Sequence, residues 1–331
     1  MSRKFLRSLT TAMLLGLGTK AAASPLLLTD MTGRQVALSE PATRIVTTYM
    51  PASILSLSLG LGDNLVGVSS QDNRQSLVRK LLGQRSPTQV GNLTAGINLE
   101  TVLALKPDLV LISDKKDGAR LADQLAQLKV PALLIRAESL PQIEQALTLI
   151  ATAAGNPAEA ERVIDASRAL QQELSQRLTG VTPVRGYYGN GGDLYRSVGK
   201  SMFQHDLLTK AGIDNVAADV AGFYPKINLE QLLTWAPQYL VLEQGRGERI
   251  SEQLAEPQLM VLKDVPRTTL PSDALWHMPT PLAAASAYYV ASQVHPQRFN
   301  DVNVADRLGQ FYQQVVGDAC TAPFENSLCR H

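Results

Sequence analysis

Side chains suited to holding a small ligand gather just after the segments that the sequence predicts to be strands. The chain has nine tyrosines, two tryptophans and four histidines, and many of them follow such segments. Parallel α/β sheets bind ligands beyond the carboxyl ends of their strands, so these positions are expected to face a cleft. The residues predicted to contact a ligand are Tyr49, Arg74, Asn92, Tyr187, Tyr188, Tyr195, Arg196, Tyr224, Lys226, Arg246, Trp276 and His277.

These residue types favour a particular ligand chemistry. Rigid aromatic faces bind flat or chelate-shaped molecules, and arginine and lysine hold anions through charge-assisted hydrogen bonds. We therefore expect the ligand to be a compact anionic complex. Four basic side chains are candidates for binding its negative charge, and the alternative for each is a solvated surface charge. The candidate clamps are Arg74, Arg196, Lys226 and Arg246.

The loop Trp276-His277-Met278-Pro279 is the strongest single candidate for a ligand contact. Its indole can stack on a ligand, and its imidazole can fill an open position on a metal, so His277 is a possible metal ligand. The alternative is that the Trp-His pair seals the edge of a lobe.

No arrangement of residues indicates catalysis. The sequence has no Ser-centred nucleophile elbow, no HExxH or CxxC metal pair and no phosphate-binding glycine loop. The run 189–192 is rich in glycine but lacks the GxGxxG spacing, and it fits a turn at which backbone approaches a ligand. The sequence therefore predicts a binding protein without a cofactor, not an enzyme.

The elements that must position these residues alternate between short apolar runs and helical periodicity. The runs are apolar along their whole length, as is typical of parallel strands covered on both faces. We predict an α/β fold of two lobes, each with a central, mostly parallel sheet flanked by helices, joined by one long helix. The strands predicted in the first half are 26–28, 35–38, 44–48, 65–68, 109–112 and 132–135, and the helices are 52–59, 75–82, 99–105 and 119–128.

An internal repeat supports two similar lobes. Residues 97–112 read INLETVLALKPDLVLI and residues 227–242 read INLEQLLTWAPQYLVL, a spacing of 130 residues. In each copy an asparagine, Asn98 or Asn228, can cap a helix that a proline ends before the next strand. The alternative is a chance match between two helix-proline-strand units.

The segment 157–180 is predicted to be the helix that connects the two lobes. It has no strand signal, carries acids early and apolar residues at helical spacing, and ends at Gly180. This predicts an N-terminal lobe over 24–156, an interlobe helix over 157–180 and a C-terminal lobe over 181–331. A single rigid helix permits limited rocking, so the cleft should be largely formed before the ligand arrives.

Both ends of the chain point to export. Basic residues, an apolar run and the small residues Ala21–Ala23 have the layout of a signal peptide over 1–23, the alternative being a membrane anchor. Its removal takes away four basic residues and no acid, which changes the net charge from +1 to −3. That charge gives no reason to expect nucleic acid or anionic membrane as a partner. In an oxidising compartment Cys320 and Cys329 are expected to form a disulfide that closes the tail, whereas a metal site would need more ligands.

The chain resembles the helical-backbone, or class III, substrate-binding proteins of ABC importers. The resemblance is carried by DMTGRQVALSEPATRIV, VGNLTAGINLETVLALKPDLVL, KAGIDNVAAD and LAAASAYYVASQVHPQRFNDV, in this order, and extends from about residue 26 to 302. It implies a periplasmic, monomeric protein that delivers a metal complex to a permease dimer with its ATPase, without entering the membrane. It also implies that Glu100 and Glu230, one on each lobe, dock on the permease.

The resemblance leaves the ligand open. A ferric siderophore is the first expectation, with haem, cobalamin, a nickel chelate or a molybdate-like oxyanion as alternatives in the same fold. From another class, a two-lobed enzyme subunit with a metal cluster would hold its cluster by several cysteines, whereas both cysteines here lie near the C-terminus. A sensor that signals to a membrane partner is a third alternative.

Overall fold

The computed structural model describes residues 25–92, 94–190, 192–244, 249–325 and 327–329. It contains two parallel sheets whose helices cover both faces, and it confirms the predicted α/β class. The predicted signal peptide lies outside the described residues. Within the described ranges, no helix has both the length and the apolar character that crossing a membrane requires.

The N-terminal lobe is built on a five-stranded sheet in the order β5-β4-β3-β8-β9, all parallel. Its buried strands are apolar on both faces because helices lie on either side. Its strands are β3 (Ile45–Thr47), β4 (Leu65–Val68), β5 (Thr88–Gln89), β8 (Leu109–Ser113) and β9 (Ala132–Ile135). Its helices are α1 (Met50–Ser58), α2 (Ser76–Leu82), α3 (Leu99–Ala104), α4 (Gly118–Gln127) and α5 (Leu140–Ala153). Two small hairpins complete it, β1 (Leu26–Thr29) with β2 (Gln35–Leu38), and β6 (Gly91–Asn92) with β7 (Gly96–Ile97).

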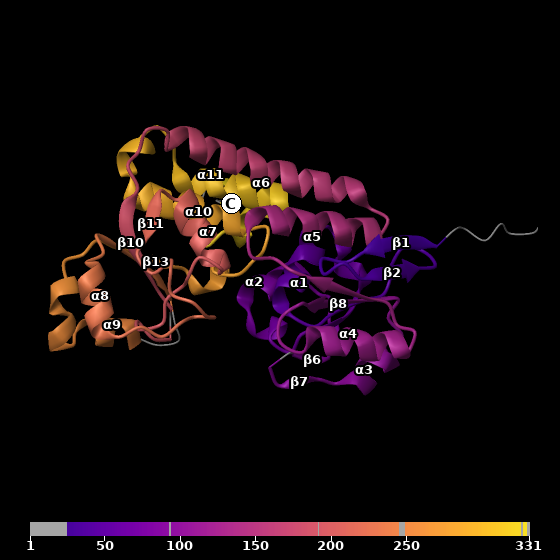
Figure 1. Ribbon diagram of the computed structural model, residues 1–331. Coiled ribbons are helices and arrows are strands. Elements are labelled where there is room, and N and C mark those ends of the chain that lie inside the picture. The colour runs from indigo at the N-terminus through magenta and orange to yellow at the C-terminus, as the bar shows by residue number, and fades with distance from the viewer. Residues whose placement is uncertain (1–24, 93, 191, 245–248, 326, 330–331) are drawn as a thin grey trace, which may run out of the picture.

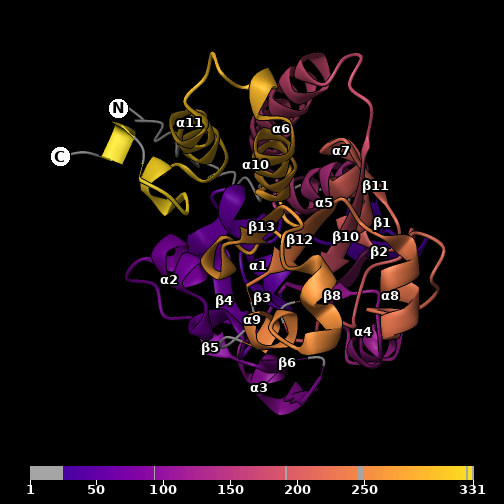
Figure 2. The ribbon, with the colours of Figure 1, turned by 90° about the vertical axis from the view of Figure 1, so that its left-hand side faces the viewer.

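The C-terminal lobe has a four-stranded parallel sheet in the order β11-β10-β12-β13. Figure 2 looks onto this lobe, with the N-terminal lobe behind it. Its strands are β10 (Val184–Gly189), β11 (Ile213–Asn215), β12 (Tyr239–Glu243) and β13 (Arg267–Leu270). Its helices are α7 (Phe203–Lys210), α8 (Leu229–Trp235), α9 (Arg249–Leu254), α10 (Ala283–Val294) and α11 (Val304–Val316).

The repeat predicted from the sequence is present in the backbone of both lobes. Asn98 and Asn228 each accept a hydrogen bond from the backbone of the residue three positions later, which caps α3 and α8. The residues before the two prolines, Lys106 and Ala236, both have positive φ, of 48° and 43°. The helices α3 and α8 therefore end in the same way, as the repeat at a spacing of 130 residues predicts.

A pair of arginines extends the correspondence to the sheets. Arg44, just before β3, donates to the carbonyl of Leu105 at 2.6 Å, and Arg185 in β10 donates to that of Trp235 at 2.8 Å. A cation is favourable at the carbonyl end of a helix. The two lobes thus join the helix that carries Glu100 or Glu230 to a central strand by the same contact.

One long helix, α6 (Pro157–Arg177), runs along both lobes (Figure 1). Pro157 suits the first turn of a helix, and the buried face of α6 includes Val163, Leu170 and Leu174. It packs against α5 of the N-terminal lobe and against α10 and α11 of the C-terminal lobe. At about 1.5 Å per residue it is roughly 32 Å long, enough to span both lobes.

The end of the chain follows α11 and lies beside α2 of the N-terminal lobe (Figure 2). Cys320 and Cys329 form the predicted disulfide, with their Cα atoms 5.4 Å apart. Phe324, inside the loop that they close, stacks on Tyr289 and contacts Trp276. The closed loop thus packs on both lobes.

Candidate functional site

A cavity of about 280 Å³ lies between the two lobes. The N-terminal lobe lines it with residues at the ends of the parallel strands β3, β4, β8 and β9 or just after them, and with Asn92 and Thr94 of the hairpin that follows the parallel strand β5. The C-terminal lobe contributes the start of α7, the turn at 223–224 and the loop 277–279. The lining residues are Thr48, Tyr49, Met50, Pro51, Ser69, Gln71, Asn92, Thr94, Ser113, Asp114, Lys115, Lys116, Ile135, Ala137, Glu138, Met202, Phe203, Gln204, Phe223, Tyr224, His277, Met278 and Pro279.

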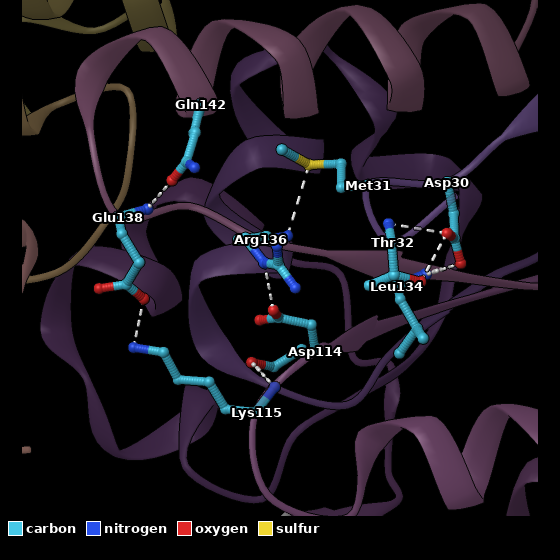
Figure 3. Close-up of polar contacts among 10 residues, drawn as sticks. Asp30, Met31, Thr32, Asp114, Lys115, Leu134, Arg136, Glu138 and Gln142 are labelled. Carbon is cyan, nitrogen blue, oxygen red and sulfur yellow. Dashed lines mark hydrogen bonds and ion pairs between the residues drawn. The ribbon is translucent and has the colours of Figure 1, made fainter. Parts of the chain in front are cut away.

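The N-terminal wall carries charges that are paired with one another. Asp114 accepts from Arg136 at 2.6 Å, and Lys115 pairs with Glu138 (Figure 3). Since Asp114 and Lys115 follow β8, and Arg136 and Glu138 follow β9, both pairs join the loops after these two strands. The backbone of Glu138 is also fixed, since its N–H donates to Gln142 at 2.6 Å. These pairs hold the wall in place and neutralise most of its charge.

Tyr49 brings a phenol to the same wall. Burial is the main reason that its pKa lies above the ordinary value, and the carboxylates of Asp114 and Glu138 raise this pKa further. Tyr49 therefore remains protonated and can offer a hydroxyl, but not a charge, to a ligand.

The C-terminal wall is held by a chain of hydrogen bonds. Gln204, at the start of α7, donates to the hydroxyl of Tyr224 at 2.7 Å and to the carbonyl of His277 at 2.8 Å. Tyr224 in turn donates to Glu243 at 3.0 Å, and Tyr188 donates to the same carboxylate oxygen at 2.8 Å. Two separate turns that line the cavity, at Tyr224 and at His277, are thus tied to one another.

His277 presents a neutral imidazole to the cavity. Burial lowers its pKa, and the nearby charge of Glu243 opposes this effect without reversing it. Over the described ranges, neither ring nitrogen has a hydrogen-bond partner. A neutral imidazole with a free nitrogen is the form that binds metals, so this residue can complete the coordination of a bound metal.

Lys115 and Phe223 join the two walls across the cavity. The ammonium group of Lys115 lies 5.1 Å from the centre of the Phe223 ring, a cation-π contact between the lobes. The Phe223 side chain is 67% exposed, and its ring packs edge-on against Tyr224. The cavity is therefore bounded at this point by an aromatic residue that is not part of the core.

Four of the residues predicted from the sequence line the cavity. Tyr49 and Asn92 come from the N-terminal lobe, and Tyr224 and His277 come from the C-terminal lobe. The structure brings them together around one volume. Their contact with a ligand remains a prediction.

The other aromatic candidates do not line the cavity. Trp276 is fully buried, and its indole N–H donates to Tyr312 at 2.9 Å, so it supports the lobe edge, as the alternative interpretation held. Tyr187 is buried and donates to the carbonyl of Leu194 at 2.5 Å. Tyr195 packs on the core of the C-terminal lobe, and Tyr188 reaches the site only through Glu243.

The expected anion clamps are also placed elsewhere. Arg74, Arg196 and Lys226 are exposed and are not among the residues that line the cavity. Arg196 instead donates to the backbone carbonyl of Tyr224 at 3.2 Å. Arg246 lies outside the described residues. In this structure the three described clamps therefore do not line the cavity, and their contact with a ligand stays a prediction.

Several residues of the site were missed. Ala137 and Glu138 lie just after β9, and their place after a predicted strand is the signal in the sequence that marks them. Met202, Phe203 and Gln204 begin a helix well after β10, and only the tertiary fold brings them to the cavity.

Glu100 and Glu230 lie where the repeat predicts. Each is exposed in the first turn of its helix, α3 or α8. An acid there is stabilised by the helix dipole and remains accessible to a partner.

Comparison with known proteins agrees with this architecture. A family model described as "Periplasmic binding protein" matches residues 45–262. The vitamin B12-binding protein of Pectobacterium atrosepticum is 28% identical over 228 residues, covering 66% of this chain and 78% of that protein. The molybdate-binding protein MolA of Haemophilus influenzae is 26% identical over 341 aligned positions, covering 93% and 96% of the two chains.

Solved structures show the same fold. Helicobacter pylori CeuE in a complex with nickel and histidine superposes with a TM-score of 0.76 at 18% identity, covering 89% of this chain and 96% of that one. The family match spans more than half of the chain, and these proteins bind solutes without a cofactor of their own. The chain therefore belongs to the periplasmic binding protein family, and it is a binding protein, not an enzyme.

Proposed function

We propose that this protein is the periplasmic solute-binding component of an ABC importer and that it carries a compact metal chelate in the cavity between its lobes. The observation that carries the proposal is the free imidazole of His277 in a cavity that both lobes line. Imidazole nitrogen is a good ligand for iron, nickel, copper and zinc. The surrounding apolar and aromatic side chains suit the organic part of a chelate.

The charges of the cavity favour a chelate over a free anion. Among the described lining residues the ionised groups are Asp114, Glu138, Lys115 and Lys116, two acids and two bases. With His277 neutral, and with Arg136 counted as the partner of Asp114, the bases of this wall exceed its acids by one. A bare oxyanion would therefore meet only a small excess of positive charge, whereas a chelate with a shielded metal needs none.

The size of the cavity favours a small member of this class. Ligand pockets commonly enclose roughly 300–1,000 Å³, and the value of about 280 Å³ lies just below this range. A small ferric siderophore or an amino-acid chelate of nickel fits this range better than haem or cobalamin, which would require the lobes to separate.

Native mass spectrometry of protein purified from its own periplasm tests the proposal. We expect a bound mass that contains a transition metal, and its loss in His277→Ala. Visible absorption then separates ferric catecholates, haem and cobalamin from colourless ligands. Protein that carries no metal, and that binds no ferric or nickel chelate in titrations, would contradict the proposal.

A molybdate-like oxyanion is the second candidate. The alignment with molybdate-binding MolA covers 93% of this chain, more than that with the vitamin B12-binding protein of P. atrosepticum. The hydroxyl and amide groups of Ser69 and Asn92 line the cavity and can donate to an oxyanion. Titration with sodium molybdate separates the candidates, because only the oxyanion candidate predicts saturable binding without a metal chelate.

Export and docking complete the proposal. We infer that residues 1–23 direct secretion and that Glu100 and Glu230 set the loaded protein on a permease dimer coupled to an ATPase. The exposed positions of both acids and their equivalent helices support this role. The helix α6 lies between the predicted lobe boundaries at 156 and 181. We infer that it is a stiff connector that limits motion between the lobes. Glu100→Lys with Glu230→Lys should abolish uptake by cells while ligand binding persists, and a loss of binding would contradict the docking assignment.

A further inference from the structure

We propose that Glu243 and Gln204 are positioning residues that hold Tyr224 and the 277–279 loop together as one preformed wall of the cavity. The inference rests on the proposed function, since it concerns the same cavity. It adds a role for Glu243, which is not among the residues that line the cavity, and for Gln204, whose side chain is almost wholly buried.

The direction of the hydrogen bonds supports the proposal. A phenol has one hydrogen, and the amide nitrogen of Gln204 donates to the Tyr224 oxygen at 2.7 Å. The hydrogen of Tyr224 is therefore available to Glu243, whose oxygen lies 3.0 Å away. The same carboxylate oxygen accepts from the buried Tyr188 at 2.8 Å, which anchors it to β10.

The backbone at Tyr224 needs such an anchor. Tyr224 has φ of 45°, a region in which bulky residues are strained, and it follows a glycine turn in which Gly222 has φ of 114°. Its backbone is held by Arg196 on one side and by the sulfur of Met202, which accepts from the Tyr224 N–H at 3.3 Å, on the other. The side-chain bond to Glu243 fixes the direction of the ring.

Gln204 extends the arrangement to the second turn. The same amide nitrogen that meets Tyr224 donates to the carbonyl of His277 at 2.8 Å. The position of the imidazole is thus coupled to the position of the Tyr224 ring through one buried side chain. Because this wall is ordered before the ligand binds, less conformational entropy is lost on binding and the affinity is higher.

The test uses the full-length mature protein and four variants. Glu243→Ala removes the acceptor, Glu243→Gln retains an acceptor oxygen, and Gln204→Glu keeps the shape but removes both donated bonds. Glu252→Ala is the matched control, because Glu252 is an exposed acid on α9 of the same lobe. Hydrogen exchange of segments 222–226 and 277–279 is measured without ligand, and binding of the nickel-histidine chelate is measured by calorimetry.

We expect Glu243→Ala to increase exchange at 222–226 and Gln204→Glu to increase it at both segments. Each should weaken chelate binding about tenfold, the factor that corresponds to one lost hydrogen bond. Glu243→Gln should restore most of the affinity, which a general loss of stability would not explain, and Glu252→Ala should resemble the wild type.

Unchanged exchange in both segments, or a Glu243→Gln protein as impaired as Glu243→Ala, would overturn the proposal. If Glu243→Ala fails to fold, the two shape-conserving variants decide the question. If the wild type binds no chelate, the proposed function fails, and the exchange data still decide whether these residues position the wall.

Discussion

Lys115 of the N-terminal lobe lies over the ring of Phe223 of the C-terminal lobe, 5.1 Å from its centre, and the two residues meet at the cavity. Each also contacts a residue of its own lobe, since Lys115 pairs with Glu138 and Phe223 packs on Tyr224. The contact between the lobes therefore joins two groups, each of which is also held by a residue of its own lobe.

Phe223→Ala should weaken ligand binding by about two- to fivefold, the range for an exposed cation-π contact of about 0.5–1 kcal/mol. The effect should appear as faster dissociation in stopped-flow measurements, because the contact exists only with the lobes together. Phe223→Tyr keeps the ring and serves as the control. Equal dissociation rates for the alanine variant and the wild type would show that the contact plays no part in retention.

Asp72 makes stability depend on pH. Its side chain is buried in the N-terminal lobe, one oxygen accepts from Ser53 at 2.5 Å, and the other has no hydrogen-bond partner among the described residues. Burial raises the pKa of this carboxyl to about 6, and the bonds from Ser53 and Ser69 oppose the shift. The pKa of Asp72 is higher in the folded protein than in the unfolded chain. Ionisation of this carboxyl therefore lowers the free energy of unfolding as the pH rises from about 4 to beyond 6.

Asp72→Asn should remove that cost. We expect the wild type to lose about 2 kcal/mol of unfolding free energy from this group between pH 4 and pH 7, and the variant to lose much less over the same interval. Urea denaturation at several pH values measures the difference. Parallel pH profiles for the two proteins would contradict the assignment.

Glu173 fastens α6 to the C-terminal lobe. Its carboxylate accepts from Arg307 of α11 at 2.7 Å, from Tyr288 of α10 at 2.6 Å, and from Arg177 within α6 at 3.0 Å. Glu173→Ala should destabilise the protein by about 1–3 kcal/mol, less than for a fully buried pair because the site is partly exposed. Glu173→Gln should lose less, and chemical denaturation compares them. A neutral effect of the alanine change would show that the apolar face of α6 suffices.

The disulfide should stabilise the tail against the lobes. Replacing Cys320 and Cys329 by serine should lower the unfolding free energy by about 2–3 kcal/mol, the loop-closure value for a short loop. Reduction of the wild type with dithiothreitol should have the same effect, and the double variant should not respond to the reductant. A variant that is as stable as the oxidised wild type would mean that packing of Phe324 alone holds the tail.

The scaffold could be predicted from sequence because its signals are local. Asparagine caps, a proline after each helix and apolar runs identify α3, β8, α8 and β12, and the repeat places them in equivalent positions. Two residues of the N-terminal wall, Tyr49 and Asn92, could be predicted because ligands bind beyond the carboxyl ends of parallel strands.

The C-terminal wall was harder to predict, because burial and ligand contact call for the same residue types. Trp276 and His277 are neighbours after the same strand, yet the indole enters the core and the imidazole faces the cavity. Gln204 reaches the site only because α7 packs beside the 277–279 loop, a contact between segments more than 70 residues apart. No local pattern marks such a residue.

The matching contacts of Arg44 and Arg185 have a consequence for how this molecule can acquire new cargo. The strand and helix that each arginine joins are the same in both halves, whereas the turns around the cavity differ between them. Mutations in one set of turns can therefore alter what is recognised while the joint that presents Glu100 or Glu230 keeps its shape. Under the docking role proposed for Glu100 and Glu230, ligand recognition and delivery to a permease can therefore change independently by mutation.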